Sequence, residues 1–407
     1  MNEKLRKTLK GITIFCVITL ILLGIFILYQ IITREEERLE FDSINSFIKV
    51  EDGFIAVGSN NINDQGHELA KITRYNEEKE KEWETFFNNG YNGAFFDVAQ
   101  DGDTFVAVGS VEADTEENEE GLRSALITRY DENGRLIFSE VFQILGNSRF
   151  NSVKVVETGY IVVGQSIFPN MTLGLSEEGG GIIVKFDREG NVLWQNNFGG
   201  SSSGLFNDFI IVDDVIYVVG KDAARVGLIM KYDLDGERIT STIYEYTDTL
   251  GFTGIIEEDG YLYIVGAKHV VDEDDNISSD ALIVKYDLDL NFIQKQIYSG
   301  EGMERFNQLI VDENNNLVIV GHSAIVDEEE STKDLNVFAH RGILAKYRTD
   351  LTEILIEYYS QSRDDYFTDI IETKEHYVVV GYSKYERNSF FSRFIIFSKA
   401  GRVLDVR

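Results

Sequence analysis

The chain has 407 residues, 43% of them hydrophobic, and a formal net charge of −32 at pH 7. This charge argues against nucleic acid as a partner, because phosphate backbones are bound by clustered Lys and Arg. The single cysteine, Cys16, excludes an intrachain disulfide and the cysteine patterns of zinc and redox sites.

The first predicted element is a membrane-spanning helix at residues 11–32. These 22 residues carry no charge, and as a helix they can cross a hydrocarbon core of about 30 Å. Basic residues are in excess at residues 1–10, so the positive-inside rule predicts a cytoplasmic N-terminus and an extracytoplasmic remainder. A cleaved signal peptide is the alternative, but the apolar run is long for one and an A-x-A-like cleavage site is missing. We expect an uncleaved single-pass anchor, followed by a tether at residues 33–40.

Beyond the tether, a repeated unit is marked by a glycine that ends a β-branched apolar run, as in FIAVG and YIVVG. An aromatic residue stands fourteen or fifteen positions before six of these glycines, and Ile44 takes its place in the first copy. A basic–aromatic–acidic triplet follows the glycine in the first five copies, fits in part in the sixth, and is reduced to Phe397 in the seventh. The repeated glycines are Gly58, Gly109, Gly164, Gly220, Gly266, Gly321 and Gly381.

Each copy has the pattern of four short strands rich in Val, Ile, Tyr and Phe. The second strand is almost continuously apolar, which indicates burial on both faces. Four-stranded units of this kind, repeated without helices, are typical of a β-propeller. We therefore predict an all-β fold, a seven-bladed β-propeller with four-stranded blades over residues 41–407, preceded by one N-terminal transmembrane helix.

The connection between the third and fourth strands carries an Asp and, three residues later, a Gly, as in Asp187 to Gly190. An Asp side chain can bond the N–H two residues on, and Gly accepts positive φ, which together favour a type I turn with a bulge. Leu290 occupies the glycine position in the fifth copy. We expect Asn291 to adopt the left-handed conformation there instead.

The combination of VVG, KYDxxG and a Trp four residues later resembles bacterial β-propeller repeats of the SBBP and delta-60 kind. It is also similar, more distantly, to quinoprotein-dehydrogenase-like repeats. The resemblance covers about residues 41–407 and implies a propeller without implying an activity. In the quinoprotein-like type the Trp docks against the next blade, a position that Trp194 fits. Phe138 and Trp83 stand at the corresponding places, whereas the other copies lack an aromatic residue there.

No catalytic motif is present in the sequence. None of the five histidines lies in an H-E-x-x-H pattern, G-x-S-x-G is absent, and Cys16 lies within the predicted membrane span. His322 directly follows Gly321 and is either directed toward the propeller axis or top face, or is a tolerated loop residue. We predict no catalytic residue and no cofactor.

Three acidic segments, residues 111–121, 270–280 and 325–334, lie between predicted second and third strands, which places them on one face of a propeller. The second shares the D-x-D-x-N alternation of a calcium loop, but Ile277 replaces the required Gly and the final Glu is missing. A solvated acidic rim is the simpler interpretation, and weak cation binding is the alternative. The candidate calcium ligands are Asp272, Asp274 and Asn276. The candidate partner-binding residues are Glu116, Glu117, Glu119, Glu120, Asp327, Glu328, Glu329 and Glu330.

These patterns predict a membrane-anchored extracytoplasmic propeller of a bacterial cell membrane. It would act as a binding or scaffolding module for a protein or a cell-envelope polymer. The alternative is an envelope hydrolase or lyase with carboxylates at the central channel, because a propeller fold does not select between them. Convergent carboxylates with a His at the axis would favour the enzyme, and a polar axis filled by small residues would favour binding. The sequence leaves the closure of the ring open, and one hypothesis is that residues 37–41 pair beside the final strand at residues 401–407.

Overall fold

A computed structural model of the chain describes residues 40–61, 68–88, 92–112, 122–142, 147–168, 178–198, 204–222, 226–244, 249–271, 277–326, 338–386 and 389–407. The predicted membrane segment at residues 11–32 lies outside these ranges. Within them, no helix has the length and apolar character that crossing a membrane requires. β1 begins at Glu40, the last residue of the predicted tether.

The described strands form four-stranded sheets, which we call blades and number in chain order. Blade one contains β1 (Glu40–Val50), β2 (Gly53–Asn60), β3 (Leu69–Tyr75) and β4 (Lys81–Phe87). Blade two contains β5 (Gly93–Asp101), β6 (Thr104–Glu112), β7 (Arg123–Tyr130) and β8 (Leu136–Phe142). Blade three contains β9 (Asn147–Val156), β10 (Gly159–Phe168), β11 (Glu178–Phe186) and β12 (Val192–Phe198). Blade four contains β13 (Leu205–Val212), β14 (Val215–Lys221), β15 (Gly227–Asp233) and β16 (Arg238–Ile243).

The C-terminal half of the ring repeats the same plan. Blade five contains β17 (Thr249–Glu258), β18 (Tyr261–Val271), β19 (Ile277–Asp287) and β20 (Phe292–Tyr298). Blade six contains β21 (Met303–Val311), β22 (Asn316–Val326), β23 (Phe338–Arg348) and β24 (Glu353–Tyr359). Blade seven contains β25 (Asp364–Glu372), β26 (His376–Glu386), β27 (Ser389–Ser398) and β28 (Val403–Val406).

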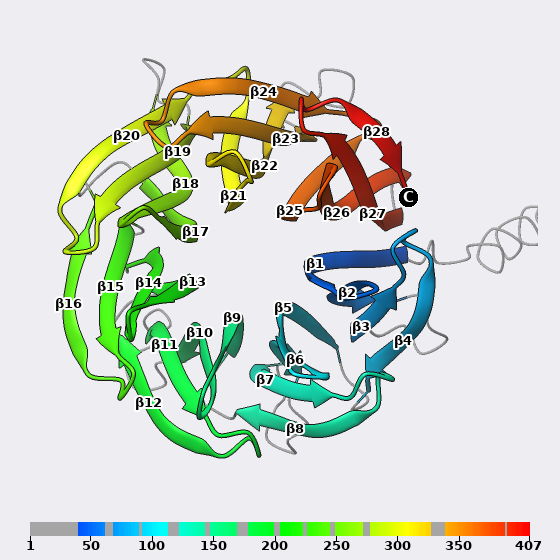
Figure 1. Ribbon diagram of the computed structural model, residues 1–407, viewed down its shortest axis with the longest axis vertical. Helices are drawn as coiled ribbons and strands as arrows, with labels where there is room; N and C mark the ends of the chain where they lie inside the picture. The colour runs from blue at the N-terminus through cyan, green and yellow to red at the C-terminus, as the bar shows by residue number, and fades with distance from the viewer. Residues whose placement is uncertain are drawn as a thin grey trace, which may run out of the picture. The chain divides into compact units, whose positions relative to one another are not determined.

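Consecutive strands within a blade pair antiparallel, and the blades are arranged in a ring with the first strand of each nearest the axis (Figure 1). The fourth strand of each blade lies on the outside of the ring. Residues 40–407 are therefore an all-β assembly of four-stranded antiparallel sheets, the architecture of a β-propeller.

The repeated glycines allow two strands to approach closely near the axis. Gly109 pairs with Phe95 across β6 and β5, and a Cβ on Gly109 would lie 1.9 Å from the carbonyl oxygen of Ala94. Directly after Phe95 the register shifts by one residue, so Phe96 bulges out of the ladder. The same pairing and shift recur in the other six blades. The glycine recurs because a side chain at this position would collide with the backbone opposite.

The second strands are buried on both faces, as their continuous apolar runs predicted. In β6, Phe105 and Ala107 pack against blade one, whereas Val106 and Val108 pack against blade three. Seven such apolar clusters form among the described residues, and each joins two neighbouring blades. Burial of each large aliphatic side chain contributes about 1.5–3 kcal/mol, so the blades are stabilised mainly by their neighbours.

In blades three, four and five the basic residue of the repeated triplet reaches a turn of the next blade, and so does the outer-strand Trp of blades one and three. Lys185 donates to the carbonyl oxygen of Leu234 at 3.1 Å, and Nε1 of Trp194 donates to the same oxygen at 3.1 Å. Trp83 makes the corresponding bond to Glu132 at 3.1 Å. The predicted docking of Trp194 on the neighbouring blade is confirmed. Lys231 and Lys285 bond the next blade as Lys185 does, so the basic residue of the triplet joins consecutive blades in this part of the ring.

The turns between third and fourth strands also show one wrong prediction. Leu290 has a φ of 63°, so Leu290 rather than Asn291 adopts the left-handed conformation. The Leu290 side chain is 8% exposed and packs in the core between blades four and five. That burial offsets a conformational cost of about 1–2 kcal/mol. Across the described turns of this type, the left-handed residues are Lys79, Gly134, Gly190, Gly236, Leu290, Leu351 and Gly401.

The first strand joins the last blade through β27 and not through the final strand, β28. β28 pairs with β27, whereas Glu40 and Phe41 pair in parallel with Ser389 and Phe390 at the start of β27. The Phe41 ring lies 5.6 Å from the Phe390 ring, centroid to centroid, so an aromatic contact favours this position. Residues 37–39 of the hypothesised closing segment lie outside the described ranges.

Candidate functional site

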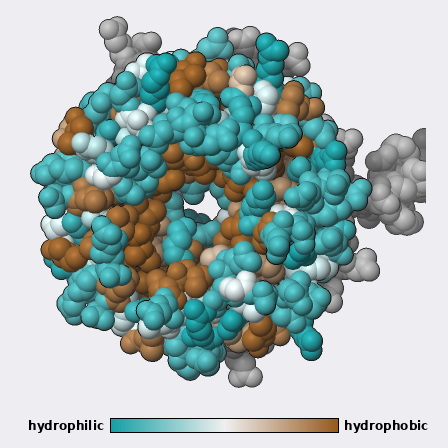
Figure 2. All heavy atoms as spheres, in the orientation of Figure 1, coloured by the Kyte–Doolittle hydropathy of each residue, from teal (hydrophilic) through white to brown (hydrophobic). Residues whose placement is uncertain are grey.

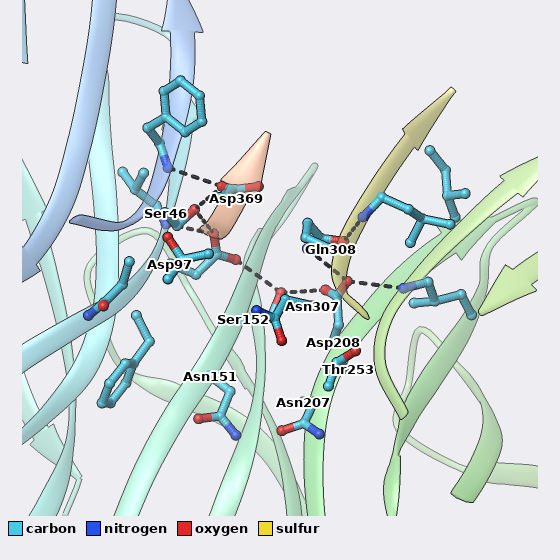
Figure 3. Close-up of a pocket in the computed structure, with 18 of the residues that line it drawn as sticks. Ser46, Asp97, Asn151, Ser152, Asn207, Asp208, Thr253, Asn307, Gln308 and Asp369 are labelled. Atoms are coloured by element: carbon cyan, nitrogen blue, oxygen red, sulfur yellow. Dashed lines mark hydrogen bonds between the residues drawn. The ribbon is translucent and has the colours of Figure 1, made fainter. Parts of the chain in front are cut away.

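The central channel is lined by the bulged residues of the first strands and by the residues that follow them. They enclose a cavity of about 410 Å³ into which polar side chains of several blades converge (Figure 3). Figure 2 shows that the ring is hollow at its axis on the face drawn, where hydrophilic and hydrophobic side chains border the opening. Because the bulge follows the repeated aromatic residue in each blade, the repeat itself directs these side chains to the axis.

The bulged residues form one set of contacts around the channel. Asn45 donates to the carbonyl oxygen of Phe95 in the next blade at 2.7 Å, and Thr368 donates to that of Ile44 at 2.9 Å. Phe96 has no group that can make this bond, so it is missing between blades two and three. The remaining bulged donors, with bonds of 2.5–2.8 Å, are Asn151, Asn207, Thr253 and Asn307.

Three aspartates occupy the position after the bulge, in blades two, four and seven. Each accepts the N–H of the residue that follows it at 2.8 Å. Each also accepts a backbone N–H from the next blade, so every carboxylate bridges two blades. The donor–acceptor pairs are Val153 with Asp97 at 2.9 Å, Ile255 with Asp208 at 3.3 Å, and Phe47 with Asp369 at 3.1 Å.

Two serine hydroxyls connect these carboxyl groups into one chain, which Figure 3 shows as dashed lines. Ser46 Oγ lies 3.0 Å from Asp97 Oδ1 and 2.9 Å from Asp369 Oδ2. Ser152 Oγ lies 3.0 Å from Asp97 Oδ2 and 3.0 Å from Asp208 Oδ1. A hydroxyl has one proton to donate, so a serine can bond to both of its neighbours only if one carboxyl group is protonated. The geometry therefore favours a bound proton in this chain.

The electrostatics of the channel identify Asp369 as a group that binds such a proton. Burial, with a smaller contribution from the charge of Asp97, raises the pKa of Asp369 to about 7. Lys154 of β9 also lines the cavity. Burial lowers the pKa of Lys154, but the charges of Asp97, Asp208 and Asp369 outweigh this effect and raise it. Lys154 therefore stays protonated and balances part of the negative charge.

The carboxyl groups of Asp97, Asp208 and Asp369 are hydrogen-bonded within the protein. All six of their oxygens take part in a hydrogen bond with a backbone N–H or a polar side chain. The described residues that line the cavity include no His and no Cys. Across the described ranges, no group of three His, Cys, Asp or Glu side chains is placed to hold a metal ion. The arrangement is suited to joining blades and to storing one proton.

The predicted calcium ligands and partner-binding residues lie outside the described residues. The calcium candidates fall in residues 272–276, and the partner-binding candidates fall in residues 113–121 and 327–337. The described strands before these segments are β6, β18 and β22, which are second strands of their blades. Strand order therefore makes the three segments leave the ring on the same face.

His322 lies in strand β22 and not in a loop. Its Nδ1 is 3.2 Å from Nδ2 of Asn307, a residue that lines the channel. Burial lowers the pKa of His322 to about 3, so the imidazole is neutral at physiological pH. Tyr366 stacks on His340 with ring centroids 4.4 Å apart, and His340 Nδ1 lies 2.9 Å from Asp364 Oδ1. The structure thus places His322 beside the channel lining, in a packed aromatic cluster between blades six and seven.

The axial aspartates and serines were not among the residues predicted from the sequence, although a signal was present. Asp97, Asp208 and Asp369 each stand two positions after the aromatic residue that aligns the repeats. Ser152 stands at the same position of blade three, and Ser46 at that of blade one. From blade one to blade seven this column reads Ser, Asp, Ser, Asp, Gly, Gln and Asp. The column before it holds Asn or Thr in every blade except blade two, where it holds Phe96. Two adjacent columns rich in polar residues, directly after a buried position, mark contacts between repeats.

Comparisons with known proteins bear on the fold. No family model matches the chain, and no curated protein matches it in sequence. The periplasmic gluconolactonase PpgL of Pseudomonas aeruginosa is similar in structure with a TM-score of 0.54 and 10% identity, over 87% of this chain and 95% of that one. Puromycin hydrolase is similar with a TM-score of 0.52 and 10% identity, over 91% of this chain and 55% of that one. The fold is that of a β-propeller. At such low identity, these similarities extend to the fold alone.

Proposed function

We propose that residues 40–407 act as a binding or scaffolding module for a protein or a cell-envelope polymer. The observation that supports this most directly is that the oxygens of the axial carboxyl groups all bond within the protein. A general acid or base must reach the proton that it transfers on a substrate. Asp97, Asp208 and Asp369 instead bridge blades, which is a structural task.

The binding surface in this proposal is the face on which the acidic connections leave the ring. The segments at residues 113–121 and 327–337 contain the partner-binding candidates named above. Acidic groups gathered on one face attract basic partners and accelerate their association at low salt. We therefore expect a partner with a basic surface, with weak calcium binding at residues 272–276 as a second property to test.

The proposal includes a membrane anchor. Residues 11–32 would cross a bacterial cell membrane once, with residues 1–10 in the cytoplasm and the propeller outside. The uncharged length of residues 11–32 and the basic excess before them support this placement.

The alternative function, hydrolysis or elimination at the central channel, is favoured by one observation. The pKa of Asp369 is raised to about 7, which suits a general acid or base near neutral pH. Asp369→Asn would abolish such an activity. In the binding proposal the same substitution leaves capture of the partner unchanged at a temperature where the variant is folded.

The experiment compares three forms of the full chain as bait against envelope fractions, each fraction with and without prior protease digestion. The first form is the wild type, and the second carries Gln or Asn at the eight partner-binding candidates. The third is a control with eight exposed acids neutralised in turns at the opposite end of the blades. Its substitutions fall at Glu77, Glu78, Glu132, Glu189, Asp235, Glu237, Asp289 and Glu353.

We expect the wild type and the control to retain the same component, and the second form to lose at least nine-tenths of it. Protease sensitivity of the captured component distinguishes a protein from a wall polymer. Equal retention by all three forms would exclude the acidic face as the binding surface. If both neutralised forms fail to retain the component, its binding depends on the net charge of the protein and not on the acidic face.

A further inference from the structure

A second cavity, of about 350 Å³, lies between blades two and three. Its lining includes Ser110 of β6, Arg123 of β7 and Arg149 of β9, together with the bulged residue Phe96. We call this cavity the arginine pocket. Two arginines in one cavity are unexpected in a chain with a formal net charge of −32, because acidic side chains that could pair with them are abundant.

Polar groups in the arginine pocket have no partner among the described residues. Ser110 is 1% exposed, and its hydroxyl makes no hydrogen bond there. The Nε of Arg149 is also buried without a partner in these ranges. Burial and the like charge of Arg123 lower the pKa of Arg149, and no described carboxylate opposes them. Buried polar groups are normally paired, so this pocket is incomplete.

The equivalent place between blades one and two is completed by the chain itself. Glu68 stands where Arg123 stands, because the backbone N–H of each donates at 2.8 Å to an asparagine side chain of the next blade. Ser59, the equivalent of Ser110, donates to Glu68 Oε1 at 2.6 Å. A carboxylate therefore satisfies the serine there.

The equivalent place between blades six and seven is also complete. His340 stands in the position of Arg123, and Asp364 in that of Asn147. The carboxylate of Asp364 accepts the backbone N–H of His340 at 3.0 Å and lies 2.9 Å from its Nδ1. The His340 ring is stacked on a tyrosine, which fills the remaining space.

The arginine pocket has Asn147 in place of this carboxylate. Glu112 stands opposite Arg123 in the ladder between β6 and β7, but its Oε1 accepts from Asn92 at 2.9 Å. No described carboxylate lowers the cost of burying Arg149.

The local geometry prepares Arg149 for an anion with paired oxygens. Its guanidinium carbon lies 5.4 Å from the centroid of the Phe96 ring. A guanidinium held over an aromatic face keeps its N–H edges available, and these match the paired oxygens of carboxylate and phosphate groups. Phe96 is also the bulged residue that forms no bond to the next blade, so this departure from the repeat coincides with the pocket.

We propose that the arginine pocket binds an oxyanion of the carboxylate or phosphate class. The guanidinium groups of Arg123 and Arg149 bind its oxygens, and the hydroxyl of Ser110 donates to it. The pocket lies at the end of the blades from which the acidic connections leave, because β6 ends at Glu112 and β7 begins at Arg123. None of its lining residues is a partner-binding candidate of the proposed function, so the two proposals are tested with different variants.

The test measures binding of inorganic phosphate and, separately, succinate to the full chain by calorimetry, with chloride keeping the ionic strength constant. We expect a dissociation constant in the millimolar range or below for at least one anion. The dissociation constant of that anion should rise at least tenfold in Arg149→Gln and in Arg123→Gln. The control is Arg135→Gln, since the Arg135 side chain is 83% exposed and already paired with Asp131. The control should bind as the wild type does.

Ser110→Ala provides a second measurement that does not depend on an arginine. It should weaken anion binding several-fold and leave the melting temperature of the unliganded protein unchanged or higher, because the removed hydroxyl has no partner. Binding that is equal in the arginine variants and the wild type would overturn the proposal, as would no binding of either anion at tens of millimolar.

A final arm distinguishes an external anion from the chain's own carboxylates. Residues 113–121 connect β6 to β7 and are rich in Glu. A variant with Gln at Glu116, Glu117, Glu119 and Glu120 should bind the anion as the wild type does, within a factor of a few. Binding seen in this variant alone would overturn the proposal, because the wild-type pocket would then be occupied by its own connection.

Discussion

The hydroxyl of Thr368 donates a 2.9 Å hydrogen bond to the carbonyl oxygen of Ile44, across the junction between the last and first blades. The two residues lie 324 positions apart, yet the bond has the geometry found between consecutive blades. Thr253 donates in the same way to Phe306 at 2.8 Å. The ring therefore closes by the contact that joins blades elsewhere, with a short parallel pairing between β1 and β27 added to it.

The first prediction concerns this closing bond. Thr368→Val keeps the shape of the side chain and removes the donor to Ile44 and to Val380, which accepts at 3.2 Å. We expect a loss of about 1–2 kcal/mol in the free energy of unfolding, because carbonyl groups lose their partner. The matched control, Thr253→Val, removes equivalent bonds within the chain and should have the same effect in urea unfolding. A loss in the control alone would show that the closing bond does not contribute in solution.

The second prediction concerns a leucine in the left-handed conformation. Leu351 has a φ of 62° and is 2% exposed, in the core between blades five and six. Leu351→Ala loses burial and keeps the strain, at a cost of about 2–5 kcal/mol. Leu351→Gly loses the same burial and relieves the strain, so it should be about 1 kcal/mol more stable than Leu351→Ala.

At position 351 the glycine variant is thus expected to be more stable than the alanine variant. The control position is Leu344, a core residue within β23 that has no positive φ. At position 344 the glycine variant should be the less stable of the two, because glycine loses more conformational entropy in a strand. Thermal unfolding of the four variants checks both orders. The same order at both positions would contradict a strained backbone at Leu351.

The third prediction follows from the raised pKa of Asp369, which is about 7 against an ordinary value of 3.8. Between these pH values the folded protein holds a proton that the unfolded chain releases. The contribution of Asp369 to stability is therefore complete below pH 4 and is lost as pH rises toward 7 and just above, by at most about 1.4 kcal/mol per pH unit.

Asp369→Asn removes this dependence, because its side chain is neutral at every pH. The stability of the wild type relative to Asp369→Asn should fall between pH 5 and pH 8, measured by urea unfolding at each pH. Thr368→Val is the control, because it removes no titratable group and its difference from the wild type should stay constant. A constant difference for Asp369→Asn would show that Asp369 is ionised throughout this range.

Much of the fold followed from local patterns. The repeated Gly reports a close approach of two strands, the aromatic residue before it reports a buried core position, and the Asp-to-Gly turn reports a left-handed backbone conformation. Few residues suit each of these places, so the three marks recur visibly and indicate the strand pattern. The turn at Leu290 was misassigned because tertiary burial of that side chain outweighs the local preference of Asn291. Closure stayed open at the level of the sequence, because no local pattern reports that Glu40 and Phe41 meet the start of β27 at the other end of the chain.

The candidate sites, like the fold, have a part that the sequence predicts and a part that depends on the tertiary structure. The repeat, its strands and the excess of acidic residues between second and third strands could be predicted from the sequence, because they depend on composition and short-range geometry. The docking of Trp194 followed only from the resemblance to quinoprotein-like repeats, because its acceptor, the carbonyl oxygen of Leu234, lies in the next blade. Only the tertiary structure decided that Asp97, Asp208 and Asp369 join one chain of hydrogen bonds, and that Arg123 and Arg149 share a cavity. These residues come from different repeats, and what each one contacts depends on the neighbouring blade that the closed ring places beside it.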